Sequence, residues 1–429
     1  MTTKFKDQTV FKLIAAEEKR QREGLELIPS ENYVSAEVLA AMGSVFTNKY
    51  SEGYPGMRYY GGQINTDAIE SLAIERAKKL FKADHVNVQS HSGAQANEAV
   101  YHAWLEPGDT IMGMELSHGG HLTHGRPGTI SAKLFNFVRY GIKDIESGEI
   151  DYEAMREIAI KTKPKIILAG FSSYPRELDY AKFQSIGDEV GAVLMADMAH
   201  IAGPIAAGLL KNPFDYGFRV MTTTTHKTLR GPRGAMILSK GNLGNPLKAV
   251  DKIVDNLPTL IDRSVFPGLQ GGPHMHIIAA KSVALYEAAQ PDFKQYCINM
   301  LANAKKLSVE LMNRGFKLVT NGTDNHLILA DIQTSFNFDG DMAEKILDRI
   351  GLTVNKNVVP DDPLPPFKPS GIRLGTPAIT TRGLGEEHMV IIADWIYRAL
   401  KSPHDELALD KIAAEVRKLA SSFPLPNDN

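Results

Sequence analysis

The chain has 429 residues, with 48 lysines and arginines against 50 aspartates and glutamates, so its formal net charge is −2. Hydrophobic residues make up 43% and charged residues 23%, which excludes wholesale disorder and a membrane bundle. The near-zero balance gives no basic footprint for nucleic-acid binding, and the length predicts two domains or one large domain with an appendage.

The N-terminus and the cysteine content predict a location. Cys297 is the only cysteine, so neither an intrachain disulfide nor a multi-cysteine zinc site can form, and we expect a packing role in a reducing compartment. Residues 1–24 lack the apolar core of a signal peptide and carry acidic residues that a transit peptide would avoid. No stretch approaches the roughly 20 apolar residues of a membrane span. We therefore expect a cytoplasmic protein with no membrane partner.

The first two thirds of the chain predict an α/β domain. Residues 9–23 have helical spacing, and residues 25–62, rich in Gly, Tyr, Ser and Asn, predict an irregular surface segment. Beyond them, amphipathic helices alternate with short apolar strands, which predicts a mostly parallel sheet covered on both faces. The expected strands are 85–89, 110–114, 165–170, 192–196, 220–224 and 234–238, and the expected helices are 69–81, 94–104 and 184–190.

The last third groups its elements differently and predicts a smaller α+β domain. The expected elements are a helical stretch from 273 to about 313, strands at 316–320 and 326–332, a helix at 340–350, and extended pieces at 353–355 and 372–375. The proline-rich run 360–369 predicts a rigid loop. The expected domains are an N-terminal arm and active-site loop (1–65), a large α/β domain (66–285) and the C-terminal domain (286–429).

One lysine ends a run of β-branched residues in the segment VMTTTTHKTLRGPRG, 220–234. The run predicts a strand that ends at His226 and Lys227 and is followed by a Gly/Pro turn. A lysine recessed and partly desolvated there could form a Schiff base with an aldehyde cofactor. The alternative is an ordinary strand-end lysine.

An aspartate follows the apolar run 192–196. Because the carboxyl ends of parallel strands line the ligand crevice, Asp197 would project into it. A buried carboxylate needs a cationic partner, and the protonated pyridine nitrogen of pyridoxal phosphate is one. His200 could touch the phenolic oxygen of that ring. The alternative is a structural aspartate that caps the following helix.

The segment SHSGAQAN, 90–97, joins a predicted strand to a predicted helix. Small residues at a helix N-terminus leave backbone N–H groups and a positive dipole end for a phosphate ester. The glycine spacing matches neither a P-loop nor a dinucleotide fingerprint. A phosphate turn, an aspartate and a lysine, in this order along one α/β domain, are the layout expected of a pyridoxal-phosphate enzyme.

Three further segments carry candidate functional side chains. SHGGHLTH (117–124) holds three histidines, but no nearby carboxylate completes a ligand set, so we favour an imidazole that stacks on the cofactor ring over a metal site. In YSEGYPGMRYYGG (50–62), Glu52 could act as a general acid/base, although an aromatic packing loop is the alternative. Arg373, in SGIRLG, could clamp a substrate carboxylate or form a surface salt bridge.

With these residues in view, the chain resembles the serine hydroxymethyltransferase family, of the aminotransferase-like fold type I of pyridoxal-phosphate enzymes, over nearly its full length. The motifs that carry the resemblance are LIPSEN (27–32), TNKYSEGYPGMRYYGG (47–62), HSGAQAN (91–97), HGGHLTHG (118–125), DMAHIAG (197–203), TTTTHKTLRGPRG (222–234), VFPGLQGGP (265–273), TDNHL (323–327), TVNKN (353–357) and SGIRLGTPA (370–378). Pro29 and Ala94 depart from the usual pattern, which has alanine and often serine at these positions.

The resemblance implies cofactor and substrate contacts at the matching positions. Lys227 would hold pyridoxal phosphate as a Schiff base, Asp197 would pair with the pyridine nitrogen, and His121 would stack on the ring. The other implied cofactor contacts are Ser92, Gly93 and Ala94 at the phosphate, Ser172 and His200 near the phenolic oxygen, His226, and Tyr50, Gly271 and Gly272 from a neighbouring subunit. The implied substrate contacts are Ser30, Tyr60, Arg233 and Arg373 for the amino acid, Glu52 as the acid/base carboxylate, and Leu116, Gly120, His121, Leu122, Asn357, Pro365, Pro366 and Phe367 for folate. His226 and Tyr60 would also take part in catalysis.

The implied reaction moves the hydroxymethyl group of serine to tetrahydrofolate through an external aldimine, giving glycine and 5,10-methylenetetrahydrofolate. The active unit would be a homodimer or a dimer of dimers. Two alternatives of the same fold are a folate-independent aldolase for β-hydroxy amino acids and a hydroxymethyltransferase for α-methylserine. A non-enzymatic RNA-binding role is disfavoured by the Lys227/Asp197 pair and by the net charge of −2. No metal is expected.

Overall fold

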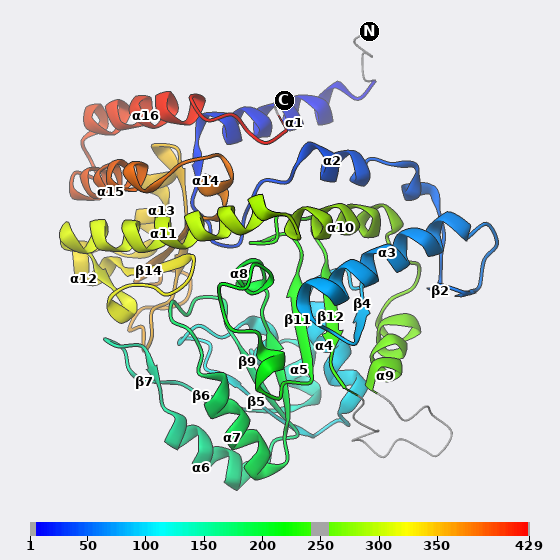
Figure 1. Cartoon of the computed structure of the whole chain (residues 1–429). Coiled ribbons are helices and arrows are strands. Elements are labelled where there is room, and N and C mark those ends of the chain that lie inside the picture. Colours follow the sequence, from blue (N-terminus) through cyan, green and yellow to red (C-terminus); the bar gives the residue numbers. More distant parts are fainter. Residues whose placement is uncertain (1–5, 242–256, 428–429) are drawn as a thin grey trace. The chain divides into compact units, whose positions relative to one another are not determined.

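The computed structural model describes residues 6–241 and 257–427 (Figure 1). The chain divides into two compact units, Val34–Ile298 and Met1–Tyr33 with Asn299–Asn429. The boundary between Ile298 and Asn299 falls within helix α11 (Pro291–Asn313). The domain boundaries expected near residues 65 and 285 stay predictions. In the part of the chain that the structure describes, no helix combines the length and the apolar composition of a membrane span.

A seven-stranded sheet in the order β4-β12-β11-β10-β9-β5-β6 forms the centre of the unit 34–298. The strands are β4 (His85–Asn87), β5 (Thr110–Met114), β6 (Asn136–Tyr140), β9 (Ile166–Gly170), β10 (Val193–Asp197), β11 (Val220–Thr224) and β12 (Ala235–Ser239). Strands β6, β5, β9, β10 and β11 are parallel, whereas β12 is antiparallel to both β11 and β4. The predicted α/β fold with a mostly parallel sheet is confirmed.

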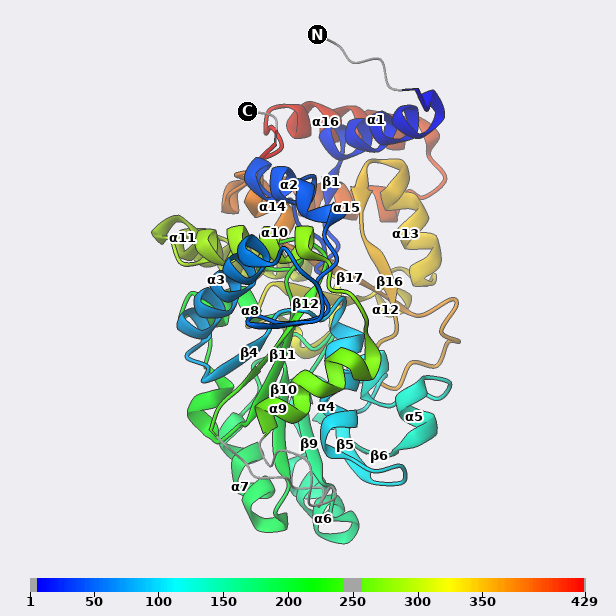
Figure 2. The same ribbon diagram turned by 90° about the vertical axis from the view of Figure 1, so that its right-hand side faces the viewer.

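Helices cover both faces of this sheet (Figure 2). Met195 of β10 belongs to a buried cluster with residues of α4 (Gly93–Trp104) and α9 (Leu257–Arg263). Its neighbour Leu194 faces Gly187 of α7 (Tyr180–Val190), where a Cβ on the glycine would lie 2.7 Å from a leucine methyl. Since successive strand residues point to opposite faces, α7 covers the face opposite α4.

The remaining elements of this unit surround the sheet. Helices α3 (Ile64–Phe81) and α10 (Met275–Ala288) pack against each other, as both ribbon views show. The other elements are α2 (Ala36–Met42), α5 (Ile130–Leu134), α6 (Tyr152–Thr162), α8 (Ala202–Ala206), the hairpin β2 (Gly53–Tyr54) with β3 (Met57–Arg58), and the hairpin β7 (Ile142–Asp144) with β8 (Glu149–Ile150).

The other unit contains an antiparallel four-stranded sheet in the order β13-β14-β17-β16. Its strands are β13 (Lys317–Leu318), β14 (Leu327–Asp331), β16 (Asn355–Asn357) and β17 (Gly371–Gly375). A separate parallel pair joins β1 (Leu25–Glu26) to β15 (Leu352–Thr353). The helices are α1 (Gln8–Glu23), α12 (Ile332–Phe336), α13 (Gly340–Arg349), α14 (Pro377–Thr381), α15 (Glu386–Lys401) and α16 (Glu406–Ser421).

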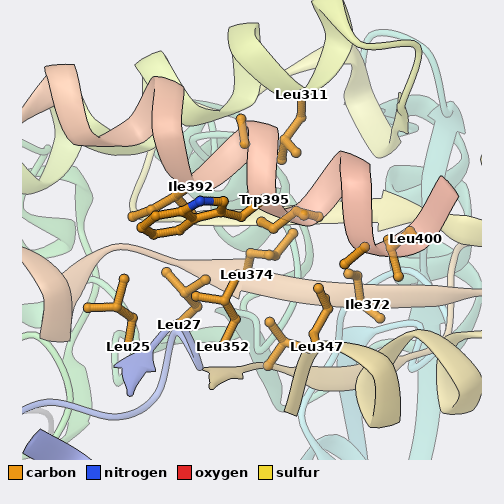
Figure 3. Packing of buried hydrophobic residues seen from close by; sticks show 14 of the residues in the cluster. Leu25, Leu27, Leu311, Leu347, Leu352, Ile372, Leu374, Ile392, Trp395 and Leu400 are labelled. Atoms are coloured by element: carbon orange, nitrogen blue, oxygen red, sulfur yellow. The ribbon is translucent and has the colours of Figure 1, made fainter. Parts of the chain in front are cut away.

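The core of this unit lies between the sheet and the long helices (Figure 3). Trp395 and Ile392 of α15 pack near Leu374 of β17, and Leu27 from the N-terminal segment belongs to the same buried cluster. The indole nitrogen of Trp395 donates to Glu415 Oε2 of α16 at 2.8 Å. The N-terminal segment is therefore built into this core through β1 and Leu27.

Several predicted elements differ from the observed ones. Helix α3 begins at Ile64 rather than 69, and the helical stretch 273–313 is two helices because Pro291, which cannot donate an N–H bond, starts α11. Strand β13 stops at Leu318, since Thr320 has a φ of 66°. Helices α5, α6, α15 and α16 and strand β6 are absent from the predicted elements, although α15 and α16 are both amphipathic.

Candidate active site

Asp197 is the last residue of β10, at the carboxyl end of the parallel sheet. Its partner across the ladder is Thr222 of β11, and the side chain of Asp197 is 9% exposed. The N–H of Ala199 donates to Asp197 Oδ1 at 3.1 Å. The aspartate thus makes a local turn contact, as the capping alternative expects, but its second oxygen is held by groups from elsewhere in the fold.

Two buried side chains hold Asp197 Oδ2. Asn97 Nδ2 of α4 donates to it at 2.8 Å, and His124 Nε2 lies 3.1 Å from it. The N–H of His121 donates to His124 Nδ1 at 3.1 Å, which leaves Nε2 of His124 as the donor to the carboxylate. Burial by itself raises the pKa of the Asp197 carboxyl, but the hydrogen bond from His124, the charges of His124 and His121 and the hydrogen bond from Asn97 together outweigh it and hold that pKa well below its usual range. The carboxylate is ionised at neutral pH.

Asn97 is itself fixed in orientation. Its amide oxygen accepts a hydrogen bond from Thr222 Oγ1 at 2.6 Å, and its amide nitrogen donates to Thr123 Oγ1 at 2.8 Å as well as to Asp197. Asn97 is 0% exposed. One amide therefore joins α4, β10, β11 and the turn that carries His121.

The histidine turn lies beside Asp197. The N–H of Thr123 donates to His121 Nδ1 at 3.2 Å, and Thr123 Oγ1 lies 2.7 Å from the same nitrogen. Ligand atoms of His121, His124 and Asp197 lie within 4.8 Å of one another, so the fold supplies the carboxylate that the sequence of this turn lacks. Both ring nitrogens of His124 are already engaged with the protein, however, and the His121 ring is oriented by Thr123. This bonding favours an organic ligand over a metal.

Lys227 lies in a closed loop after β11. The N–H of Thr225 donates to the Gly234 carbonyl at 3.0 Å, and Thr225 Oγ1 donates to the Pro232 carbonyl at 2.6 Å. Lys227 is 9% exposed. Burial, followed by the charges of Arg233 and Lys227, lowers the pKa of the neighbouring His226 to about 3, so this imidazole is neutral. The loop holds a recessed lysine in a setting that an ordinary surface lysine lacks.

The predicted phosphate turn, residues 90–94, leads into α4. Ser92 is the N-cap of the helix, and its Oγ accepts from the Gln95 N–H at 3.3 Å. A Cβ on Gly93 would lie 2.9 Å from a methyl of Thr224, so glycine allows the helix start to approach the end of β11. The first N–H groups of the helix have no acceptor within the helix itself. Gln270 fastens the turn, because its side chain accepts from the His91 N–H at 3.1 Å and donates to the Gln89 carbonyl at 2.9 Å.

Other residues named from the sequence lie around these groups. Ser172 donates its N–H to the Gly119 carbonyl at 2.6 Å, which brings it to the histidine turn. His200 is buried, and its carbonyl accepts from Thr228 Oγ1 at 3.0 Å, which brings it to the Lys227 loop. Leu116 and Gly120 are half-buried in the segment before His121, and Leu122 is exposed.

A second group of predicted site residues lies on an exposed surface of the same unit. Tyr50 OH lies 3.3 Å from Glu52 Oε1, and the Tyr50 and Tyr60 rings meet edge to face. A Cβ on Gly271 would lie 3.4 Å from Glu52 Oε1, and one on Gly272 would lie 3.1 Å from the Tyr50 ring. Segments 50–60 and 271–272 therefore form one surface.

The buried side chain of Arg58 stabilises the β2–β3 hairpin and the adjacent Glu52. Its buried guanidinium donates to Asp67 at 2.9 Å and to the carbonyls of Ser51 and Gly53 at 2.8 Å, and it pairs with the buried Glu70. The hairpin that carries Glu52 is thus a fixed structure rather than a loose aromatic loop.

The remaining candidates lie in the unit that contains the C-terminal sheet. Arg373 lies on β17, where its Nε donates to Asn355 Oδ1 of β16 at 3.1 Å. Ser30 is half-buried after β1, and Asn357 ends β16 with its Nδ2 donating to the Val358 carbonyl. The proline-rich loop is organised by Asp362, which accepts from Ser370 Oγ at 2.6 Å and from the N–H groups of Val359, Leu364 and Ser370. Pro365, Pro366 and Phe367 are exposed on this loop.

These groups fit pyridoxal phosphate by their chemistry. Asp197 is an ionised, buried carboxylate, and among the described residues it pairs with no lysine or arginine, so it suits a cationic ring nitrogen. Ser90 Oγ and His91 Nε2 are buried polar atoms without a partner at the turn that leads into the α4 N-terminus. Lys227 offers a recessed amine in the same unit.

The fold is that of fold type I of the pyridoxal-phosphate-dependent enzymes, with its mostly parallel large sheet. A model of the serine hydroxymethyltransferase family matches residues 3–396. The chain belongs to this family, and it is a pyridoxal-phosphate-dependent enzyme of serine and glycine hydroxymethyl transfer.

Asn97, His124 and Thr222 are not among the residues predicted to act at the site. A signal for Asn97 was present, because the residue lies on the apolar face of α4 between Ala96 and Val100, where a polar side chain must find buried partners. His124 and Thr222 gave no such signal, since their contacts with Asp197 and Asn97 join segments far apart in the sequence.

Proposed function

We propose that this enzyme transfers the hydroxymethyl group of serine to tetrahydrofolate, giving glycine, 5,10-methylenetetrahydrofolate and water, and catalyses the reverse reaction. The observation that carries the proposal is the ionised Asp197 at the end of β10, beside the strand that leads into the Lys227 loop. Such a pair fits a cofactor that needs both an amine and a counter-charge.

The cofactor would be held by groups of the unit 34–298. Lys227 would bind its aldehyde carbon, and Asp197 would keep its ring nitrogen protonated. Its phosphate would accept from Ser92 and from the N–H groups of Gly93 and Ala94. The remaining proposed contacts are His121 against the ring face, Ser172 and His200 near the phenolic oxygen, and the neutral His226 beside Lys227. When bound, pyridoxal phosphate supplies an electron sink for the electron pair left on the amino-acid Cα.

Glu52 would move the proton of the serine hydroxyl group. The carboxylate lies beside the Tyr50 hydroxyl on the hairpin that Arg58 fixes, and among residues 6–241 and 257–427 no cation pairs with it. Loss of the hydroxymethyl group requires the hydroxyl proton to leave and a proton to return to the Cα. We assign the first transfer to Glu52, with Tyr60 alongside.

Binding of the substrates is assigned to the residues that the family resemblance implies. Arg373, Ser30 and Arg233 would bind the amino acid, with Arg373 on its carboxylate, because a strand-held guanidinium can donate two parallel hydrogen bonds. The folate would contact Leu116, Gly120, His121, Leu122, Asn357, Pro365, Pro366 and Phe367. The Asp362-centred bonding of the proline-rich loop supports a fixed surface at the last three of these positions.

A homodimer or a dimer of dimers is proposed as the active form. Large apolar side chains are exposed along segment 45–64, including Val45 at 80%, Met57 at 72% and Ile64 at 84%. A patch of this kind is typical of a protein interface, and it adjoins the surface of Tyr50, Gly271 and Gly272 that we expect to face a second subunit. The buried, reduced Cys297 is consistent with a cytoplasmic enzyme.

The decisive assay supplies purified enzyme with serine, with and without tetrahydrofolate, and measures glycine. We expect glycine to form from serine only when tetrahydrofolate is present. An equal rate without tetrahydrofolate would identify a folate-independent aldolase and overturn the transferase proposal. Replacement of serine by α-methylserine tests the third candidate, and faster turnover of that substrate would overturn the preference for serine.

A further inference from the structure

Lys281 of α10 is a buried lysine that the proposed reaction does not use. Its side chain is 1% exposed, and its Nζ donates to three backbone carbonyls, those of Val88 at 2.6 Å, Ala235 at 2.7 Å and Ser90 at 3.0 Å. An ammonium group has three donors and no acceptor, so these three carbonyls match the protonated amine. Among the described residues, no carboxylate forms a salt bridge with it.

The three carbonyls lie where the β12–β4 pairing passes into the turn before α4, and the Ala235 N–H still donates to the Ser90 carbonyl there at 3.0 Å. The β12–β4 ladder runs from Ser239 paired with His85 to Ile237 paired with Asn87. Beyond Asn87 the chain leads through Val88 and Ser90 into the phosphate turn, whereas Ala235 follows directly from the Lys227 loop. The ammonium group of Lys281 therefore joins the base of the phosphate turn to the end of the loop that carries the reactive lysine.

Gly234 has no side chain and so leaves room for the side chain of Lys281. A Cβ at Gly234 would lie 2.6 Å from Lys281 Cε and 3.1 Å from its Nζ. The backbone of Gly234 also closes the Lys227 loop through its bond with Thr225. Any larger residue at position 234 would displace either the loop or the ammonium group.

The charge of Lys281 acts on both sides of the site. Burial lowers the pKa of Lys281 to about 7, an effect that the charge of Glu70 on α3 opposes. Burial, followed by the charges of His274 and Lys281, lowers the pKa of His91 to about 4, and the charge of Lys281 is also felt at His226. The protonated form of Lys281, which the three carbonyl acceptors match, is a buried cation beneath the proposed anion-binding turn and would stabilise an anion bound there.

We propose that Lys281 is a positioning residue for the cofactor phosphate, which it serves by fixing the phosphate turn to strand β12 and by placing a buried positive charge beneath that turn. This inference rests on the proposed binding of pyridoxal phosphate at the Ser92–Ala94 turn. It goes beyond that proposal, because Lys281 would not touch the phosphate and would act through the backbone of Ser90 and Ala235.

The test compares two aldehydes that differ only in the phosphate. The full-length enzyme, stripped of cofactor, is titrated with pyridoxal phosphate and with pyridoxal, and binding is followed by the absorbance of the bound aldehyde. The variants are Lys281→Met, which removes the charge and all three donors, and Lys281→Gln, which keeps two donors without the charge. Lys79→Met, on the exposed side of α3, is the matched control.

In Lys281→Met we expect the Kd for pyridoxal phosphate to rise by about tenfold to a hundredfold, the range for loss of a charged hydrogen-bonding group. The Kd for pyridoxal should change by less than about threefold, and the control should match the wild type for both. For Lys281→Gln, the Kd for pyridoxal phosphate should lie between the values of the wild type and of Lys281→Met. This variant carries the test if Lys281→Met fails to fold.

Three results would overturn the proposal. The first is an unchanged affinity for pyridoxal phosphate in both Lys281 variants. The second is an equal loss of affinity for pyridoxal phosphate and for pyridoxal, and the third is failure of both variants to fold. Either of the last two results would mean that Lys281 stabilises the sheet as a whole. A wild-type enzyme that binds neither aldehyde would instead refute the proposed function, so the two failures are distinguishable.

Discussion

Asn97→Ala tests whether the buried amide is what holds the candidate cofactor counter-charge in place. The substitution removes three hydrogen bonds, of which one goes to the ionised Asp197 and two go to the hydroxyls of Thr123 and Thr222. A bond to a charged group contributes about 2 kcal/mol and a neutral bond about 1 kcal/mol, so the free energy of unfolding should fall by about 4 kcal/mol. Because Asp197 keeps His124 as a partner, the loss should not abolish folding.

The same substitution should weaken cofactor binding. Loss of one of the side-chain donors that orient Asp197 should raise the Kd for pyridoxal phosphate by about tenfold, which corresponds to about 1.4 kcal/mol. Asn303→Ala is the matched control, since Asn303 is also buried and donates two hydrogen bonds, to Thr380 Oγ1 and the Leu384 carbonyl, within the other unit. Urea unfolding and cofactor titration measure the two effects.

The control variant should lose about 2 kcal/mol of stability and keep wild-type affinity for pyridoxal phosphate. If Asn97→Ala binds the cofactor as tightly as the wild type, the role given to the Asn97–Asp197 bond is wrong. If Asn303→Ala loses affinity to the same degree, the effect reflects general destabilisation and not the geometry of the site.

Three further predictions concern other parts of the molecule. Glu52→Gln should keep the cofactor absorbance but lose folate-dependent glycine formation, and a normal rate in that variant would remove Glu52 from the proton transfer. Burial, followed by the charge of Glu31, raises the pKa of Glu26 from 4.5 to about 8, so the folded state holds a proton that the unfolded state has lost, and stability should decline as the pH rises from about 4.5 to about 8. Glu26→Gln should remove that decline in thermal melts, and a decline of the same size in the variant would contradict the assignment. Trp395→Ala should lower the free energy of unfolding by about 3–5 kcal/mol, whereas Leu407→Ala, 83% exposed on α16, should change it by less than about 0.5 kcal/mol, and equal urea midpoints would refute the account of the core.

The alternating pattern of the first two thirds of the chain was enough to predict the α/β fold, because strands β5, β9, β10 and β12 of the central sheet are mainly apolar runs that are buried along nearly their whole length. The order of the strands could not be predicted from that pattern, since it depends on contacts between distant segments. Pro291 could have been used to predict the end of α10 and the start of α11, because proline is common at the first position of a helix. The helical spacing of apolar residues continues on both sides of Pro291, however, and this spacing predicts one long helix.

Some features of the candidate site could likewise be predicted from the sequence, and others could not. The strand-end positions of Asp197 and Lys227 followed from local pattern and the topology of parallel sheets. The bonds that make Asp197 a persistent anion come from α4 and from the turn after β5, and no spacing rule connects these segments. Lys281 was also not predicted, because a lysine is ordinarily solvated and only the fold shows its three carbonyl partners.

The central claim is that Lys227 is the lysine that carries the cofactor. Borohydride reduction of the enzyme loaded with pyridoxal phosphate, followed by digestion and mass spectrometry of the peptides, tests it most directly. We predict a reduced pyridoxyl group on the peptide that contains Lys227, and an unlabelled peptide for Lys281, the other lysine that is buried among the described residues. Stoichiometric label on Lys281, or on any lysine other than Lys227, would contradict the account.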